Sequence, residues 1–257
     1  MIFFIFSCWI DVEAKLGDFA NRADVDYEVE EGLIFDSAVP GGVAFEGQAL
    51  RKNYVNTNDT LYIWEPPQNY IEVGSFSWQG QPVEDVTDIA IDLQGQLFAV
   101  TDNMIFSVNA ETAELELEGT VSRALVGLAF LSTGELVGAG DGVYLIDKNS
   151  FEMEPLIPSG RYQTSGDIVG HPNGNLYWTV QSGTGNLDDF VEISGTQTTF
   201  LGTLSTSFVW GLGMANEQIY GFSATGEVHQ LFINGDNQEV QSSTQGWWGA
   251  ATNPIWW

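Results

Sequence analysis

Two aspartates occupy equivalent places in the chain, and their type and spacing suit the binding of a cation. Asp88 opens the stretch "DIAIDLQGQLFAV" and Asp167 opens "DIVGHPNGNLYWT". Related stretches open with Gly127 ("GLAFLSTGELVGA") and Gly211 ("GLGMANEQIYGFS"), and a shorter fifth one, "GAATNP", opens with Gly249. If the five stretches surround one axis, two carboxylates face space that three glycines leave open. Two such carboxylates, with carbonyl and water oxygens, are ligands that Ca²⁺ accepts.

One position earlier in each stretch lie Thr87, Val126, Gly166, Trp210 and Trp248. We therefore expect a ligand site at one mouth of the assembly, made by Asp88, Asp167, Trp210 and Trp248, with Asp88 and Asp167 as the metal ligands. A polar or cationic ligand would stack on the tryptophans. The partner expected from these residues is a small molecule, a glycan or a protein. The alternative is structural: the aspartates cap backbone amides and the tryptophans pack.

Catalytic patterns are weak, and we predict no catalytic residue. His171 lies in the turn "HPNG" and His229 in a later strand-like stretch, so a shared metal site is not expected. The stretch "GFSAT", residues 221–225, lacks the second glycine of a nucleophile elbow.

The elements that position these residues are short strands in a repeat. Each of the four longer stretches reads as a strand, a polar turn and a second strand, with Gly95, Gly134 or Gly174 in three of the turns. The starts lie 39, 40, 44 and 38 residues apart. Two further strand-like pieces follow each pair, for example "MIFSVNA" and "LELEGTV". Four strands in roughly 40 residues are typical of a β-propeller blade.

The sequence thus predicts an all-β propeller of five four-stranded blades, or six if residues 27–50 contribute strands. The chain begins its first blade with outer strands only and ends with the inner-strand sequence "GWWGAATNP". We expect this last strand to complete the first blade, which would close the ring and pair both free edges. The propeller would span residues 49–257. Residues 9–48 precede it, and within them "DVDYEVEE" (residues 24–31) is an acidic linker or an exposed edge strand.

Composition limits the partners. Lys and Arg number 7 against 35 Asp and Glu, so the formal net charge is −28 and nucleic acid or an anionic lipid surface would be repelled. Charged residues make up only 16% of the chain, and a surface of Asn, Gln, Ser, Thr and Gly is common in secreted bacterial proteins. No apolar stretch reaches the about 18 residues that a membrane helix needs. We expect a monomer.

Cys8 is the only cysteine, and it ends the segment "MIFFIFSC" at residues 1–8. An apolar run followed by a small residue and cysteine resembles the end of a bacterial lipoprotein signal, which predicts lipidation at Cys8 and an extracytoplasmic location. The other interpretation is an apolar N-terminus with an incidental cysteine.

The hairpins at Asp88 and Asp167, with "LYIWEP" and "IEVGSF", resemble those of the NHL-repeat and gluconolactonase/regucalcin propellers over residues 51–253. The resemblance implies a divalent metal in the channel, held by an early Glu and by Asn and Asp of inner strands. Asp88 and Asp167 match two such positions, while the early Glu and the Asn ligands are missing. We therefore expect an exported, non-enzymatic binding platform. The alternatives are a metal-dependent lactonase-type hydrolase and a purely structural surface protein.

Overall fold

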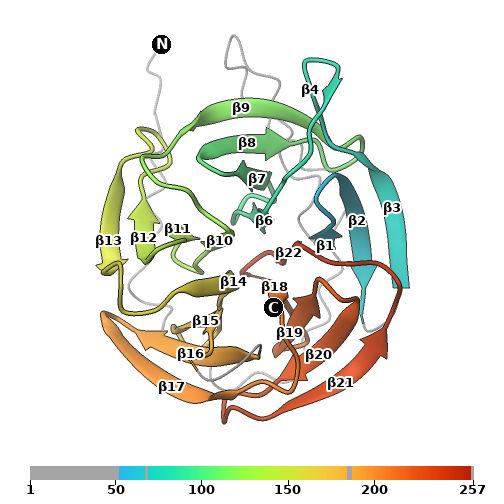
Figure 1. Ribbon diagram of the computed structural model, residues 1–257. Helices are drawn as coiled ribbons and strands as arrows, with labels where there is room; N and C mark the ends of the chain where they lie inside the picture. Colours follow the sequence, from blue (N-terminus) through green and yellow to red (C-terminus); the bar gives the residue numbers. More distant parts are fainter. Residues whose placement is uncertain (1–51, 67–68, 184–186, 256–257) are drawn as a thin grey trace, which may run out of the picture. The chain divides into compact units, whose positions relative to one another are not determined.

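The computed structural model describes residues 52–66, 69–183 and 187–255, and within them it contains strands and turns but no helix. Five sheets surround a central axis, as predicted, so the chain forms a five-bladed β-propeller (Figure 1). None of the described residues form a helix that is long and apolar enough to cross a membrane. Cys8, the acidic segment 24–31 and the rest of residues 9–48 lie outside the described residues.

Each blade has four antiparallel strands, ordered from the axis outward. The first blade comprises β22 (Gly249–Ala251), β1 (Asn53–Asn56), β2 (Thr60–Glu65) and β3 (Asn69–Ser75). The second comprises β6 (Asp88–Ile91), β7 (Leu97–Thr101), β8 (Met104–Val108) and β9 (Glu114–Thr120). The third comprises β10 (Gly127–Phe130), β11 (Leu136–Ala139), β12 (Val143–Ile146) and β13 (Met153–Ile157). The fourth comprises β14 (Thr164–Gly170), β15 (Leu176–Gln181), β16 (Asp188–Ser194) and β17 (Gln197–Thr203). The fifth comprises β18 (Val209–Ala215), β19 (Gln218–Ser223), β20 (Glu227–Leu231) and β21 (Asn237–Ser242).

Closure of the ring follows the prediction, because β22 pairs with β1 as the inner strand of the first blade. The register joins Tyr54 to Ala251 and Asn56 to Gly249. Just before β22, Trp247 is buried, and its ring stacks on Tyr70 with the centroids 4.4 Å apart. The last strand therefore covers the free edge of β1 and adds a large buried aromatic side chain.

The apolar core is divided among the blade interfaces. Buried side chains form five clusters, and each cluster combines residues of two neighbouring blades. Between the first and fifth blades, for example, Trp64 lies edge-on to Phe222 at 4.9 Å. Along the axis, side chains of the inner strands leave a cavity of only about 20 Å³. Because the axis is filled, a sizeable ligand cannot lie in the channel itself.

Turn chemistry explains the short hairpins between inner strands. Gly95, Gly134 and Gly174 have positive φ angles of 83°, 89° and 84°, which glycine adopts without a steric penalty. In the fifth blade Asn216 and Glu217 have φ angles of 50° and 61° in a two-residue loop. Positive φ at both loop positions is the geometry of a type I′ hairpin.

The second blade carries a hairpin that the repeat did not predict. Strands β4 (Ser77–Trp78) and β5 (Gln81–Pro82) pair with each other, and β4 pairs in parallel with β9 (Figure 1). The Trp78 ring packs edge-on against Phe106 at 5.6 Å. This hairpin covers the outer edge of the second sheet, which makes the five blades unequal.

Candidate functional site

A pocket of about 530 Å³ opens where the inner strands begin. We call it the mouth pocket. Its lining comes from all five blades: Thr87, Val126, Thr164, Ser165, Gly166, Gln181, Ser182, Leu187, Asp188, Phe208, Trp210 and Trp248. The predicted ring of residues at positions 87, 126, 166, 210 and 248 is thus present and lines one pocket. Its size lies within the range of small-molecule sites, roughly 300 to 1,000 Å³.

Bulges in two neighbouring inner strands shape this pocket. The pairing of β14 with β15 shifts register between Thr164 and Ile168, and that of β18 with β19 shifts between Val209 and Gly211. Trp210 is therefore an extra residue in its strand, and a bulge of this kind redirects a side chain. Gly166 allows the two strands to approach, because a Cβ at this position would lie 2.5 Å from the Trp210 Cα atom.

Three aromatic side chains form one wall of the mouth pocket. The Trp210 and Trp248 ring centroids lie 5.2 Å apart with an interplanar angle of 82°. Phe208 continues the series, 6.1 Å from Trp210 at 77°. Phe208 is 47% exposed and has a φ of 57°, which is uncommon and strained for a bulky residue. Such backbone strain gathers at ligand sites more often than elsewhere.

Asp188 supplies the pocket's carboxyl group. It is only 4% exposed, and it accepts hydrogen bonds from the Ser165 hydroxyl and, at 2.7 Å, from the Val209 amide. The Phe208 amide also donates to this carboxyl. Burial raises the pKa of Asp188, and the hydrogen bond from Ser165 and that from Val209 oppose the rise. The carboxyl is thus hydrogen-bonded to the backbone segment that carries Phe208 and Trp210.

The predicted pair Asp88 and Asp167 comes together beneath the mouth pocket and does not line it. Both side chains are fully buried and are hydrogen-bonded to each other. Asp88 Oδ2 accepts from the Leu128 amide and Asp167 Oδ2 from the Leu212 amide, each at 2.5 Å, and each contact reaches the following blade. These are the backbone-capping contacts that the sequence left as an alternative.

Burial raises the pKa of both carboxyls, and the charge of Asp167 and its hydrogen bond raise that of Asp88 further. Two close carboxyls share a proton because both cannot ionise cheaply. No hydrogen-bond donor outside the carboxyl pair reaches Asp88 Oδ1 or Asn56 Oδ1 among the described residues. A proton on Asp88 therefore supplies a donor where the surrounding side chains offer acceptors.

The surroundings of this pair do not fit a Ca²⁺ ion. Calcium takes six to eight oxygen ligands, whereas the Leu128, Ile168 and Leu212 amides already bind three of the four carboxylate oxygens. In the described part of the chain, no three His, Cys, Asp or Glu side chains gather in a metal-binding arrangement. The Gly249 backbone packs against Asp88 Oδ1 and Asn56 Oδ1, and a Cβ at this position would collide with both oxygens.

The structure thus divides the predicted site residues into two layers. Trp210 and Trp248 line the mouth pocket, and Asp88 and Asp167 lie below it. Sequence reasoning missed Asp188 and Phe208. A signal was present, since "STSFVWGLG" places two large aromatics two residues apart at the start of an inner strand. Nothing in the sequence pattern indicates that the Asp188 carboxyl, from a different strand, accepts hydrogen bonds from the Phe208 and Val209 amides.

Comparisons with known proteins bear on the fold. No protein-family model and no curated protein matches the chain. One solved structure, described as "The de novo evolutionary emergence of a symmetrical protein is shaped by folding constraints", is 13% identical. It covers 80% of this chain and 99% of its own, with a TM-score of 0.54.

Two other similarities have lower TM-scores. Regucalcin from Agrobacterium tumefaciens, a calcium-binding protein, is 11% identical over 65% of this chain and 63% of its own, with a TM-score of 0.48. Hydrazine synthase from Kuenenia stuttgartiensis is 11% identical over 74% of this chain and 62% of its own, with a TM-score of 0.44. At these identities the likeness concerns the propeller architecture alone.

Proposed function

We propose that this protein is a binding propeller that takes a small ligand in the mouth pocket. The observation that carries the proposal is the combination, in one pocket, of three partly accessible aromatic rings and a buried carboxyl. Apolar walls with a few fixed polar groups are typical of ligand sites. The exposed side chain and strained backbone of Phe208 support the same choice, because such strain gathers at ligand sites.

Binding suits this pocket better than hydrolysis. Asp188 is the one acidic or basic side chain among the described lining residues, and its oxygens already accept hydrogen bonds from Ser165 and Val209. General acid–base catalysis requires a group that can exchange a proton with the substrate. We therefore place recognition ahead of the lactonase-type alternative.

Export and a lipid anchor at Cys8 remain part of the proposal. They rest on the segment "MIFFIFSC" and on the acidic, amide-rich composition of the chain.

The pocket is tested by screening small polar and aromatic compounds with ligand-observed NMR. We expect compounds that bind the wild type to lose at least about tenfold in affinity in Trp210→Ala and in Trp248→Ala, because each variant removes a stacking surface. Phe200→Ala is the matched control, since Phe200 is 54% exposed on the outer strand β17. Ligands that bind all three variants like the wild type, or no ligand at all, would contradict the proposal.

A further inference from the structure

We propose that the ligand of the mouth pocket is a small organic cation whose nitrogen carries alkyl groups instead of N–H donors, such as a quaternary ammonium. The inference rests on the proposed function and assigns its ligand class. Three features of the pocket carry it: the arrangement of the aromatic rings, the unpaired buried carboxylate, and the hydrogen bonds that already occupy the polar lining.

The rings form successive, nearly perpendicular surfaces. Trp248 meets Trp210 at 82°, and Phe208 meets Trp210 at 77°. Rings arranged at right angles present faces that partly surround a compact group, whereas a flat ligand is better bound by a single face or by two parallel ones. A cation placed against aromatic faces is attracted by their negative quadrupole, and Trp gives the strongest attraction. Quaternary ammonium ligands are recognised in this way.

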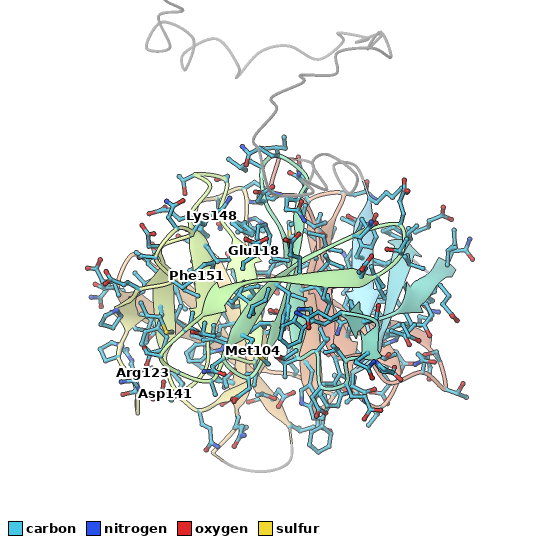
Figure 2. All side chains as sticks on the ribbon, turned by 90° about the horizontal axis from the view of Figure 1, so that it is seen from above. Met104, Glu118, Arg123, Asp141, Lys148 and Phe151 are labelled. Carbon is cyan, nitrogen blue, oxygen red and sulfur yellow. The ribbon has the colours of Figure 1, made fainter. Side chains whose placement is uncertain are left out.

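Charge in the pocket is negative and uncompensated. Among the described residues, the ion pairs are Arg123–Asp141, Lys148–Asp92 and His229–Glu227, and none of them involves Asp188. Figure 2 shows Arg123 and Asp141 toward one end of the propeller and Lys148 toward the other. The described lining of the pocket contains no Lys, Arg or His. A bound cation would offset the cost of burying the Asp188 charge, and the net charge of −28 favours its approach.

The polar lining is largely occupied by contacts within the protein. Asp188 accepts hydrogen bonds from Ser165 and Val209. The Thr164 hydroxyl accepts from Trp178 Nε1 and donates to the Gly166 carbonyl. The single Thr87 hydroxyl proton lies within reach of the carbonyls of both Val100 and Leu125. A sugar, which needs many hydrogen bonds, finds few free partners here, whereas an alkylated cation needs only charge and ring faces.

Asp188 also positions the aromatic wall. Its carboxyl accepts from the amides of Phe208 and Val209, which hold Phe208 at its φ of 57°. The same residue therefore supplies the negative charge and fixes the ring that closes the pocket. A test of the charge must separate these two roles, so it changes the ligand as well as the protein.

Isothermal titration calorimetry with choline and its neutral isostere 3,3-dimethyl-1-butanol makes this separation, because the two probes differ mainly in charge. We expect choline to bind the wild type in the millimolar range or tighter, and the neutral alcohol to bind at least about tenfold more weakly. Choline affinity should fall as NaCl is raised from 20 to 500 mM, because salt screens the attraction between the cation and the net negative charge of the protein. Glucose serves as the polar, uncharged comparison and should not bind.

Two protein variants complete the test. Asp188→Asn should weaken choline binding about tenfold or more while changing the affinity for the neutral alcohol much less. Asp189→Asn removes the same charge from the neighbouring residue, outside the lining, and should leave choline binding unchanged. If both probes bind equally well, or if glucose binds and choline does not, the ligand class is wrong while the mouth pocket keeps its function. If choline does not bind and the wider compound screen also finds no ligand of the mouth pocket, the proposed function is wrong as well.

Discussion

At the scale of single residues, the buried carboxyl pair connects two blades that are not neighbours in the ring. Asp88 and Asp167 come from non-adjacent blades, yet they share a hydrogen bond and each caps an amide of the following blade. Gly249 makes room for Asp88 next to Asn56. Burial of an acid without a cationic partner is tolerated here because backbone amides donate hydrogen bonds to it and because it can remain protonated.

The pair predicts a specific dependence of stability on pH. The pKa of each carboxyl is raised by burial in the folded protein, while an unfolded aspartate titrates near 3.9. The folded state thus holds more protons above that pH. The stability from this pair is complete below about pH 4 and is lost as pH rises through the folded pKa values.

Asp88→Asn should remove much of this loss, because the amide supplies a permanent donor next to Asn56. The free energy of unfolding of the variant minus that of the wild type should be larger at pH 9 than at pH 5, by at least about 1 kcal/mol, roughly the equivalent of one pKa unit. Urea denaturation at both pH values measures it. Asp85→Asn, an exposed change of equal charge, should show no such difference. A pH-independent effect of Asp88→Asn would mean that the pair shares no proton.

At the scale of elements, adjacent tryptophans before β22 have different tasks. Trp247 is buried and stacks on Tyr70, whereas Trp248 is half-buried and lines the mouth pocket. They alternate because successive side chains of an extended chain point to opposite sides. One closes the ring, and the other belongs to the candidate site.

This division predicts opposite outcomes for two neighbouring substitutions. Trp247→Ala should cost about 3 to 5 kcal/mol, as expected for a buried large aromatic, and should lower the melting temperature by about 10 °C. Trp248→Ala should lower the free energy of unfolding clearly less, yet it should weaken ligand binding. Thermal melting followed by circular dichroism, together with binding titrations, measures both. Equal destabilisation by the two changes would argue against the division, and an unchanged melt of Trp247→Ala would argue against its role in closure.

Sequence could predict the elements well because repetition reveals them. Strand order, blade number and closure follow from the recurring hairpins and from the orphan strands at the two ends of the repeat. The β4–β5 hairpin was not predicted, because it occurs only once in the repeat and its strands are too short to show an alternating pattern. The bulges escaped for a related reason: a bulge adds a residue to one strand, which looks like ordinary length variation until the partner strand is seen. Since Asp188 meets Phe208 and Val209 only through folding, its place in the pocket required the structure.

At the scale of the whole molecule, charge opposes compactness while five apolar interfaces maintain it. The formal charge of −28 is spread over a chain in which only 7 residues are Lys or Arg. Mutual repulsion of the carboxylates destabilises the folded state, and salt screens it. The stability of this protein should therefore depend more on ionic strength than that of a protein with balanced charges.

We predict that raising NaCl from 20 to 500 mM increases the melting temperature by several degrees. Millimolar CaCl₂ should raise the melting temperature no more than NaCl of equal ionic strength does, because the oxygens around Asp88 and Asp167 are too few for calcium. Differential scanning fluorimetry of the wild type and of Asp88→Asn/Asp167→Asn makes the comparison. A calcium-specific increase in the wild type that disappears in the double variant would instead establish the calcium site expected from the sequence.

Closure by β1 and β22 also determines how the propeller responds to a pulling force. The two strands are antiparallel, with Tyr54 opposite Ala251, so the chain enters and leaves the ring at the same end of this pair. Tension applied between residues 52 and 255 would load the three paired positions in turn, first Tyr54, then Val55 and last Asn56. Bonds loaded one at a time resist little, whereas bonds sheared together resist strongly. The β1–β22 pair that completes the ring is therefore expected to separate at the lowest force. Under this tension the first blade would open before the other four.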